Sequence, residues 1–338
     1  MKKIFTGSSI LVTGGTGSFG RTFIAYVLRN FSDIKKIIVY SRDEFKQYEM
    51  SSLPLFKNNQ KLRFFVGDVR DRDRLYRAFD NVDIVIHTAA LKQIPSCEYN
   101  PFEAIKTNVY GAQNVIDAAI DRNVQKIVAL STDKACAPIN LYGATKLCAE
   151  KLFIAGNNYA GYKKTRFSVV RYGNVAGSRG SIIPYYRSLI VSGAKELPIT
   201  DERMTRFWLT IDEAIKLVLT AINTMHGGEL YVPKIPSVKI IDIAKAIAPQ
   251  MALKDIGIRI GEKIHEMLIS KDDARNTLEF PHYFIIKPEI SELFKTNRKS
   301  NASKGKKVID GFEYTSMSNK QWLSVKQIEK AINQLKTE

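Results

Sequence analysis

The sequence predicts an α/β fold, a doubly wound parallel sheet followed by a second and smaller C-terminal domain. From residue 8 to about residue 171, short apolar segments rich in β-branched residues alternate with segments of helical period. Such alternation is typical of parallel strands joined by helical crossovers. After Asn174, prolines at positions 184, 198, 233, 236 and 249 break this rhythm into shorter elements. The break indicates where the second domain begins.

The individual elements follow from the apolar periodicity. We expect strands at residues 8–13, 36–41, 62–67, 83–88, 126–131 and 167–171. We expect helices from a glycine-rich loop to about residue 30, and then at residues 71–79, 101–122 and 141–159. Right-handed crossovers place ligands at the carboxyl ends of parallel strands. The loops that follow these strands are therefore the candidates for function.

Composition excludes several classes of protein. The 338 residues, 45% of them hydrophobic, are enough for one large core and a smaller appended domain. No apolar run reaches the length of about 18 residues that a membrane-spanning helix needs. Cys97, Cys136 and Cys148 are sparse and odd in number, which indicates reduced thiols in the cytoplasm. The four histidines lack the spacing of metal ligands, so we expect no metal site.

The net charge of +17 favours an anionic partner, unless it reflects only a lysine-rich surface. The densest basic stretch, from Lys295 to Lys307, has no nucleic-acid-binding motif beside it. Charge alone supports only nonspecific binding to nucleic acid. We therefore expect phosphate-bearing small molecules as ligands, and no nucleic acid.

The loop Thr13-Gly-Gly-Thr-Gly-Ser-Phe-Gly20 joins the first strand to the first helix. Its glycines at positions 14, 17 and 20 allow a tight turn, close approach to a pyrophosphate and close helix packing. The helix N-terminus then faces the phosphates. A lone glycine pattern is weak, but this strand–loop–helix context predicts a dinucleotide-binding Rossmann domain. We place that domain at residues 1–173.

The second strand ends in Tyr40-Ser41-Arg42, which bears on the identity of the dinucleotide. An NAD site usually has an acidic residue here, whereas Arg42 suits the 2′-phosphate of NADP. Asp43 is adjacent, and Arg42 is otherwise only a solvated charge, but we expect NADP. Asp68 and Val69, after the third strand, are expected to border the adenine, or Asp68 only caps a turn.

Tyr142 and Lys146 lie four residues apart and fall on one face of a helix. The spacing is common in surface helices, but its place just after the fifth strand favours a redox pair. Such a tyrosine takes the proton of an alcohol as a hydride leaves. Its free pKa is about 10, so ionisation near pH 7 requires about 4 kcal/mol of stabilisation. We expect Lys146 to lower that pKa in a closed site.

Asp133 and Lys134 follow the fifth strand directly, after Thr132. An Asp-Lys pair is usually part of a turn, but this one lies beside Tyr142 at the expected ligand edge. Once C4 of a hexose is a ketone, its C5 proton becomes acidic. We expect Lys134 to remove that proton as a base, kept neutral by burial and neighbouring positive charge. We expect Asp133 to protonate the departing C6 hydroxyl.

Four further residues have weaker signals. Lys92, after the fourth strand, is expected to reach the cofactor or a sugar hydroxyl, and Asn108 to orient the helix that carries the reactive groups. Arg206 and Arg259 suit bidentate contacts with a diphosphate, unless they are surface charges. The region from residue 174 to 338 is then mainly a substrate-binding domain, with about residues 205–222 returning to the first domain.

These residues also carry a resemblance over nearly the whole chain. The chain resembles the extended short-chain dehydrogenases/reductases, and more closely the inverting UDP-N-acetylglucosamine 4,6-dehydratases that begin pseudaminic acid synthesis. The retaining sugar-nucleotide dehydratases carry Thr-Asp-Glu where this chain has Thr132-Asp133-Lys134. The most specific segments are TGGTGSFG, YSRDEFK, FFVGDVRD, LSTDKACAPINLYGATK, RYGNVAGSRGS, ITDERMTRFW and GIRIGEKIHE.

The resemblance implies NADP as cofactor, UDP-N-acetylglucosamine as substrate, and a homo-oligomer from dimer to hexamer. It implies that Lys134 is the C5 base, that Asp133 is the acid beside Thr132, and that Tyr142 with Lys146 is the redox pair. The implied cofactor residues are Gly14, Thr16, Gly17, Ser18, Phe19, Gly20, Ser41, Arg42, Asp43, Glu44, Phe45, Lys46, Asp68, Val69, Thr88, Lys92, Tyr142, Lys146 and Val175. The expected substrate residues are Lys92, Asn174, Arg179, Thr200, Arg206, Arg259 and Glu262.

Three alternatives remain at this point. A 4-epimerase of the same fold needs oxidation and reduction at C4 but no acid and base for elimination, so Asp133-Lys134 argues against it. A non-catalytic NADP-binding protein has no use for an intact Tyr142/Lys146 pair. A related dehydratase that feeds another glycan pathway is not distinguished by the sequence.

Overall fold

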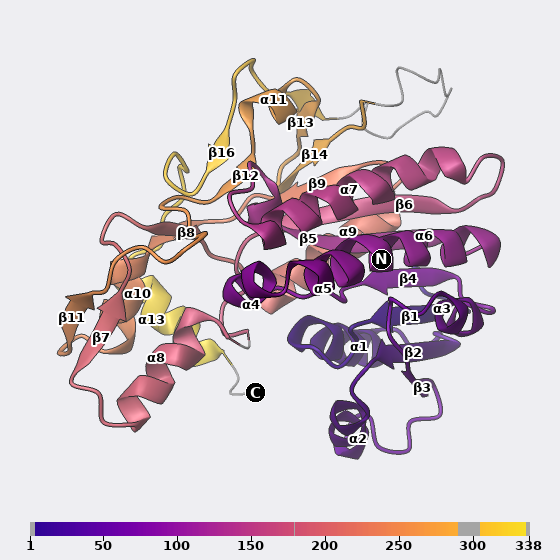
Figure 1. Ribbon diagram of the computed structural model, residues 1–338, viewed down its shortest axis with the longest axis horizontal. Coiled ribbons are helices and arrows are strands. Elements are labelled where there is room, and N and C mark those ends of the chain that lie inside the picture. Colours follow the sequence, from indigo (N-terminus) through magenta and orange to yellow (C-terminus); the bar gives the residue numbers. More distant parts are fainter. Residues whose placement is uncertain (1–3, 179, 290–304, 336–338) are drawn as a thin grey trace.

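A ten-stranded sheet forms the frame of the computed structural model, which describes residues 4–178, 180–289 and 305–335 (Figure 1). Seven of its strands run parallel to their neighbours, and three add antiparallel at one edge. In spatial order they are β3 (Leu62–Val66), β2 (Lys36–Ser41), β1 (Ser9–Thr13), β4 (Ile84–His87), β5 (Lys126–Thr132), β6 (Arg166–Tyr172), β9 (Leu230–Pro233), β14 (Tyr283–Ile286), β13 (Thr277–Glu279) and β15 (Lys306–Lys307).

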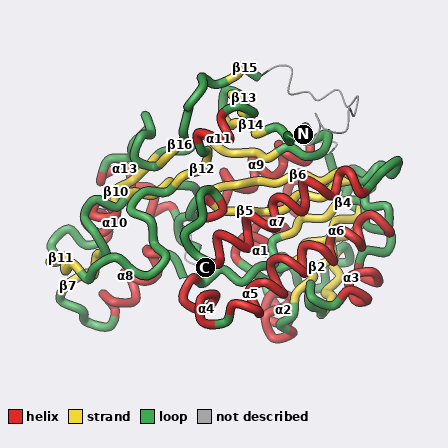
Figure 2. Tube along the Cα trace, turned by 45° about the horizontal axis from the view of Figure 1, so that its top comes forward, coloured by secondary structure: helices red, strands yellow, loops and turns green. Residues whose placement is uncertain are grey.

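Helices cover both faces of this sheet, as Figure 2 shows, and the predicted doubly wound fold is confirmed. On one face α6 (Gly111–Asp121) packs between α3 (Arg72–Ala78) and α7 (Leu141–Tyr159). On the other, α1 (Ser18–Asn30) packs against α9 (Ile211–Thr224). Buried side chains recur every three or four residues along α9, which gives that helix one apolar face against the sheet. The short α2 (Glu44–Ser52) follows β2.

The single helix expected at residues 101–122 is instead divided into three parts. After α4 (Ile94–Tyr99), α5 (Pro101–Ile105) is followed by a π-helical turn at Lys106–Tyr110, and only then by α6. This wide turn places Asn108 inside, with 2% of its surface exposed. Its side chain bonds both backbone groups of Leu91, at 2.8 and 2.9 Å, and the Thr145 hydroxyl at 3.0 Å. Asn108 therefore fastens the loop after β4 to α7.

A smaller lobe forms beyond the carboxyl ends of the parallel strands (Figure 1). Its core is separate from the main one and includes Met204, Trp208, Ile243 and Ile328. The last helix of the described chain, α13 (Val325–Gln334), packs on α10 (Ile240–Ile247) within this lobe. The lobe contains α8 (Ile182–Val191), β7 (Glu196–Ile199), β8 (Thr205–Phe207), β10 (Ser237–Lys239), α10 (Ile240–Ile247), β11 (Ala252–Asp255) and α13 (Val325–Gln334). The elements β12 (Met267–Ile269), α11 (Lys271–Ala274) and β16 (Tyr314–Thr315) contribute Leu268, Ala274 and Tyr314 to the main core.

The second half of the chain returns to the main sheet more often than the sequence indicated. Within the expected returning segment, α9 packs on β5 and β6, whereas β8 pairs with β10 in the lobe. The strands β9, β13, β14 and β15 also join the sheet, and their two to four residues are too short to show a period. No helix in the described part of the chain has both the length and the apolar character needed to cross a bilayer. The basic stretch from Lys295 lies outside the described residues as far as position 304.

Candidate active site

A cavity of about 780 Å³ opens at the carboxyl ends of the parallel strands, against the smaller lobe. Its walls come from the loops after β1 to β6 and from the segment around residues 259–262. This is where a doubly wound sheet binds its ligands. Within the described ranges, no group of three or more His, Cys, Asp or Glu residues is placed to hold a metal ion.

The glycine loop has the form of a dinucleotide-binding loop. Gly14 has a φ of +64°, and a Cβ there would lie 2.7 Å from the Thr88 hydroxyl. A Cβ at Gly20 would lie 2.7 Å from Cα of Gly15, so the helix packs directly on the turn. The predicted loop residues that line the cavity are Gly14, Thr16, Gly17, Ser18, Phe19 and Gly20. The absence of side chains at these glycines therefore allows a pyrophosphate to approach the backbone at the N-terminus of α1.

The loop after β2 places Arg42 and Asp43 differently. Asp43 caps α2 by accepting the Lys46 N–H at 3.0 Å, and its carboxylate also pairs with the Lys46 ammonium at 2.8 Å. Arg42 lines the cavity and lies 3.7 Å from the Asp68 carboxylate. Asp43 lines it as well, as do Ser41, Lys46, Asp68, Val69, Thr88, Lys92 and Val175. The predicted contacts Glu44 and Phe45 do not, and the Phe45 side chain is exposed.

Tyr142 and Lys146 both line the cavity from the first turns of α7. Burial raises the pKa of Tyr142 to about 12, and the nearby Lys134 ammonium and Thr132 hydroxyl oppose that rise. Lys146 donates a hydrogen bond to the Leu130 carbonyl at 2.7 Å, and burial lowers the pKa of Lys146 to about 8. Lys134 is therefore a second cation that acts on Tyr142, in addition to the Lys146 expected from the sequence, which remains a prediction.

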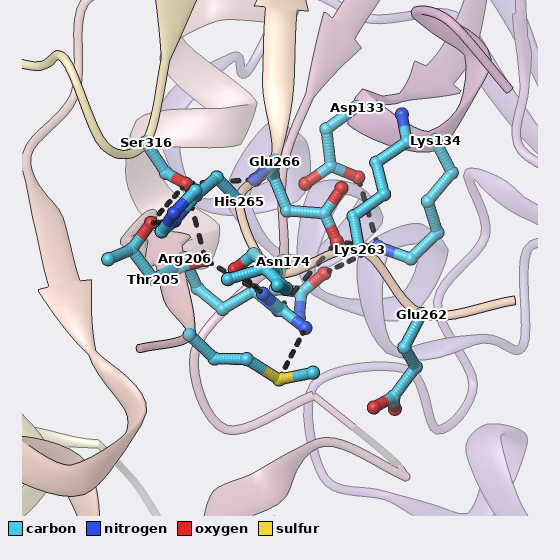
Figure 3. Close-up of polar contacts among 12 residues, drawn as sticks. Asp133, Lys134, Asn174, Thr205, Arg206, Glu262, Lys263, His265, Glu266 and Ser316 are labelled. Atoms are coloured by element: carbon cyan, nitrogen blue, oxygen red, sulfur yellow. Dashed lines mark hydrogen bonds and ion pairs between the residues drawn. The ribbon is translucent and has the colours of Figure 1, made fainter. Parts of the chain in front are cut away.

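Lys134 lies between two carboxylates, which the sequence did not indicate. Its Nζ is 3.1 Å from Asp133 Oδ1 and 3.3 Å from Glu266 Oε1, and it donates to Asn174 Oδ1 at 3.2 Å (Figure 3). Burial alone would lower the pKa of Lys134, but the Asp133 and Glu266 carboxylates raise it above its usual range. The expected neutral lysine is therefore corrected to an ammonium. The reason is that the loop before β12 brings in Glu266.

Asp133 is fully buried behind Lys134 and does not itself line the cavity. Its Oδ1 accepts a hydrogen bond from the Thr132 hydroxyl at 2.9 Å, while its Oδ2 has no partner in the described part of the chain. Burial and the Glu266 carboxylate raise the pKa of Asp133, against the opposing effect of Lys134. A raised pKa favours the protonated form of a carboxyl, and that is the form that acts as an acid.

The catalytic loop and α7 meet at Gly143, where a Cβ would collide with the Lys134 carbonyl oxygen. Asn140 caps α7 by accepting the Gly143 N–H at 2.8 Å and donates to the Gly261 carbonyl at 2.7 Å. The loop that carries Lys134, the helix that carries Tyr142 and the segment after β11 are thus directly connected.

The expected substrate residues fall into three groups. Asn174, Arg259, Glu262 and Lys92 line the cavity. Thr200 and Arg206 do not line the cavity. The Arg206 guanidinium donates hydrogen bonds to the Thr205 and Ile264 carbonyls, so the structure does not bear out the diphosphate clamp expected of Arg206. Arg179 lies outside the described residues.

Comparison with known proteins agrees with this arrangement. Residues 10–288 match a family described as "Polysaccharide biosynthesis protein". The chain belongs to this family. A relative in Campylobacter jejuni, "UDP-N-acetylglucosamine 4,6-dehydratase (inverting)", is 56% identical over 98% of both chains. The resemblance drawn from the sequence motifs is therefore confirmed.

Other relatives of the family carry other names. A "UDP-glucose 4-epimerase" of Rickettsia prowazekii is 40% identical over 97% of this chain and 96% of its own. The solved structure of Pen from Bacillus thuringiensis is 34% identical, with a TM-score of 0.88 over 98% of this chain and 100% of that one.

Proposed function

We propose that this chain is a UDP-N-acetylglucosamine 4,6-dehydratase that inverts C5, a lyase with NADP as recycled cofactor. The observation that carries the proposal is that Lys134 and Tyr142 line one cavity, with the Asp133 carboxyl buried directly behind Lys134. The full-length similarity to the Campylobacter jejuni enzyme supports it. An oxidation at C4 needs only the tyrosine and a dinucleotide, so the additional acid and base point to elimination.

The residues divide the reaction between them. NADP would be held at the glycine loop and beside Arg42, and it would supply the hydride-transfer chemistry of the reaction. Tyr142 accepts the C4 hydroxyl proton, and the Lys134 ammonium favours its ionised form. Lys134, once it has lost its own proton, removes the C5 proton, and Asp133 protonates the departing C6 oxygen. Asn174, Arg259 and Glu262 hold the UDP-sugar from the lobe side of the cavity.

The product of a wild-type turnover tests this function. With UDP-N-acetylglucosamine in deuterated water and no added reductant, we expect a 6-deoxy-4-keto sugar with inverted C5 that carries deuterium. NMR of the product measures both. A product that keeps its C6 oxygen and differs only at C4 would instead support a 4-epimerase, the alternative that the Rickettsia relative favours.

The preference for NADP rests on Arg42, because Asp43 is already engaged by Lys46. We expect Arg42→Ala to weaken NADP binding by about 10–100-fold, since a charge-assisted hydrogen bond contributes about 1.5–3 kcal/mol. NAD binding should change little, because NAD lacks the 2′-phosphate. Titration of both dinucleotides measures this, with the exposed Arg77→Ala as control. Equal weakening of NAD and NADP would show that Arg42 only shapes the loop.

We further propose that the product feeds pseudaminic acid synthesis for flagellin or another surface glycan, in line with the resemblance of the motifs. The free cysteines support a reducing, cytoplasmic setting. A homo-oligomer, from dimer to hexamer, is supported by apolar side chains exposed on neighbouring helical segments: Tyr99, Phe102 and Tyr110.

A further inference from the structure

Glu266 lies behind Lys134 and has no part in the reaction as described so far. It immediately precedes β12 and is 2% exposed. One of its carboxylate oxygens is 3.3 Å from Lys134 Nζ and 3.7 Å from Arg206 Nε (Figure 3). The other, Oε2, is buried without a hydrogen-bond partner among the residues described. A buried carboxylate in such surroundings is costly unless it balances a charge.

The backbone of Glu266 is held independently of its side chain. Its N–H donates to the Ser316 hydroxyl at 2.9 Å, and its carbonyl accepts the Ser316 N–H at 2.8 Å. The side chain is therefore not needed to fix the start of β12. Changing only the carboxylate tests its charge without removing these backbone bonds.

The charges around Lys134 divide the two carboxylates into different roles. Glu266 faces three cations, Lys134, Arg206 and Lys263, and they hold its pKa below the usual range although burial alone would raise it. Asp133 faces only Lys134 as a cation, and burial together with Glu266 raises its pKa. Arg206, Tyr142 and Lys92 also interact with Lys134, and the Arg206 charge opposes the rise in its pKa. The cations near Glu266 thus favour its charged form, whereas burial and the Glu266 charge favour the protonated form of Asp133.

We propose that Glu266 is a positioning residue that acts through Lys134: it balances the ammonium, leaves Asp133 its proton, and accepts the Lys134 proton when C5 is to be deprotonated. This inference rests on the dehydratase function proposed above. It explains how a lysine between two carboxylates becomes a base. It also explains why a second carboxylate is buried beside the first.

The proton balance of the elimination closes within the cluster. A proton passes from Lys134 Nζ to Glu266 Oε1, which are 3.3 Å apart. The freed nitrogen takes the C5 proton, and the electrons of that bond form the C5–C6 double bond as the C6–oxygen bond breaks. Asp133 gives its proton to the leaving oxygen, which departs as water. The cluster gains one proton from C5 and loses one to water.

Glu266→Gln is the test, because glutamine keeps the shape but neither carries the charge nor accepts the proton. Reduction of bound cofactor by C4 oxidation should remain, while dehydration and deuterium uptake at C5 fall by about 10²–10⁴-fold. Without the Glu266 charge the pKa of Asp133 falls, so Asp133 loses its proton at lower pH. The alkaline limb of the dehydration profile should therefore move down by about 1–3 pH units.

Two variants separate this role from a structural one. Glu266→Asp keeps the charge, so its alkaline limb should stay near that of the wild type while its rate is intermediate. Glu279→Gln is the control. It removes the carboxylate that lies 2.7 Å from Lys234 Nζ at the antiparallel edge of the sheet, and it should leave the rate and the pH profile unchanged.

An unchanged rate and pH profile in Glu266→Gln would overturn the inference. So would an equal loss of oxidation and dehydration in Glu266→Gln that Glu266→Asp does not relieve, because that pattern indicates packing. The wild type in the same assay tests the underlying function separately. If it forms no 6-deoxy product, the dehydratase proposal fails, whatever the variants do.

Discussion

Phenylalanine at position 142 is expected to stop the reaction before any hydride leaves C4. Tyr142 lines the cavity, and in the proposed mechanism its hydroxyl accepts the C4 hydroxyl proton. Removing a positioned proton acceptor costs about 10²–10⁴-fold in rate. Tyr142→Phe should therefore bind NADP and UDP-sugar normally but accumulate no reduced cofactor in single-turnover absorbance traces.

The control for this variant is Tyr283→Phe, in the outer strand β14. It removes a tyrosine hydroxyl far from the cavity wall and should leave oxidation unchanged. Normal C4 oxidation by Tyr142→Phe would mean that another group accepts the proton. The pH dependence then identifies that group.

Lys134→Ala should instead allow slow oxidation and stop the elimination. Without the base, C5 keeps its proton, so reduced cofactor appears but no 6-deoxy product forms. We expect dehydration to fall by about 10²–10⁴-fold. The measurements are cofactor absorbance and product NMR on the same sample. Near-normal dehydration with the same C5 configuration would contradict the assignment.

The same substitution should also destabilise the fold, because it leaves Asp133 and Glu266 buried without their shared cation. Breaking a buried pair costs up to about 3–5 kcal/mol. Without Lys134 the pKa of Asp133 rises further above its unfolded value, and Glu266 loses one of the three cations that hold its pKa low, so the ionised form of each carboxyl becomes less favourable in the fold. The difference in melting temperature from the wild type should therefore grow as pH rises through the range where these carboxyls ionise.

Lys134→Arg separates the charge from the base. Arginine keeps a cation between the carboxylates but does not deprotonate in proteins. We expect it to restore much of the stability but not the dehydration. Should Tyr142→Phe and Lys134→Ala stall at the same stage in single-turnover traces, the division of labour between oxidation and elimination would have to be abandoned.

The sequence predicts well those parts of the site that lie next to a strand end. The glycine loop, Arg42, Lys92 and Lys134 each follow a parallel strand directly, and parallel strands end at one edge of the sheet. Adjacency in sequence therefore predicts adjacency in space. The cavity collects most of these residues for that reason.

Adjacency to a strand end does not predict the residues that distant segments of the chain contribute to the site. Glu266 lies 132 positions after Lys134, and its charge depends on Arg206 and Lys263, which no local pattern connects with the catalytic loop. The expectation of a neutral Lys134 failed because of it. The π-helical turn at Lys106–Tyr110 is not predicted because its five residues are too few to show a period of their own.

The contact at Gly143 bears on how such an enzyme can diverge. No Cβ fits between α7 and the Lys134 carbonyl. The helix that carries Tyr142 and the loop that carries Asp133 and Lys134 therefore pack backbone against backbone. Substitutions at positions 133 and 134 change side chains and leave this backbone contact, and with it the start of α7, in place. New chemistry can then be added to an old redox step one residue at a time. A larger residue at 143 would close that route, because it would displace both halves of the machinery together.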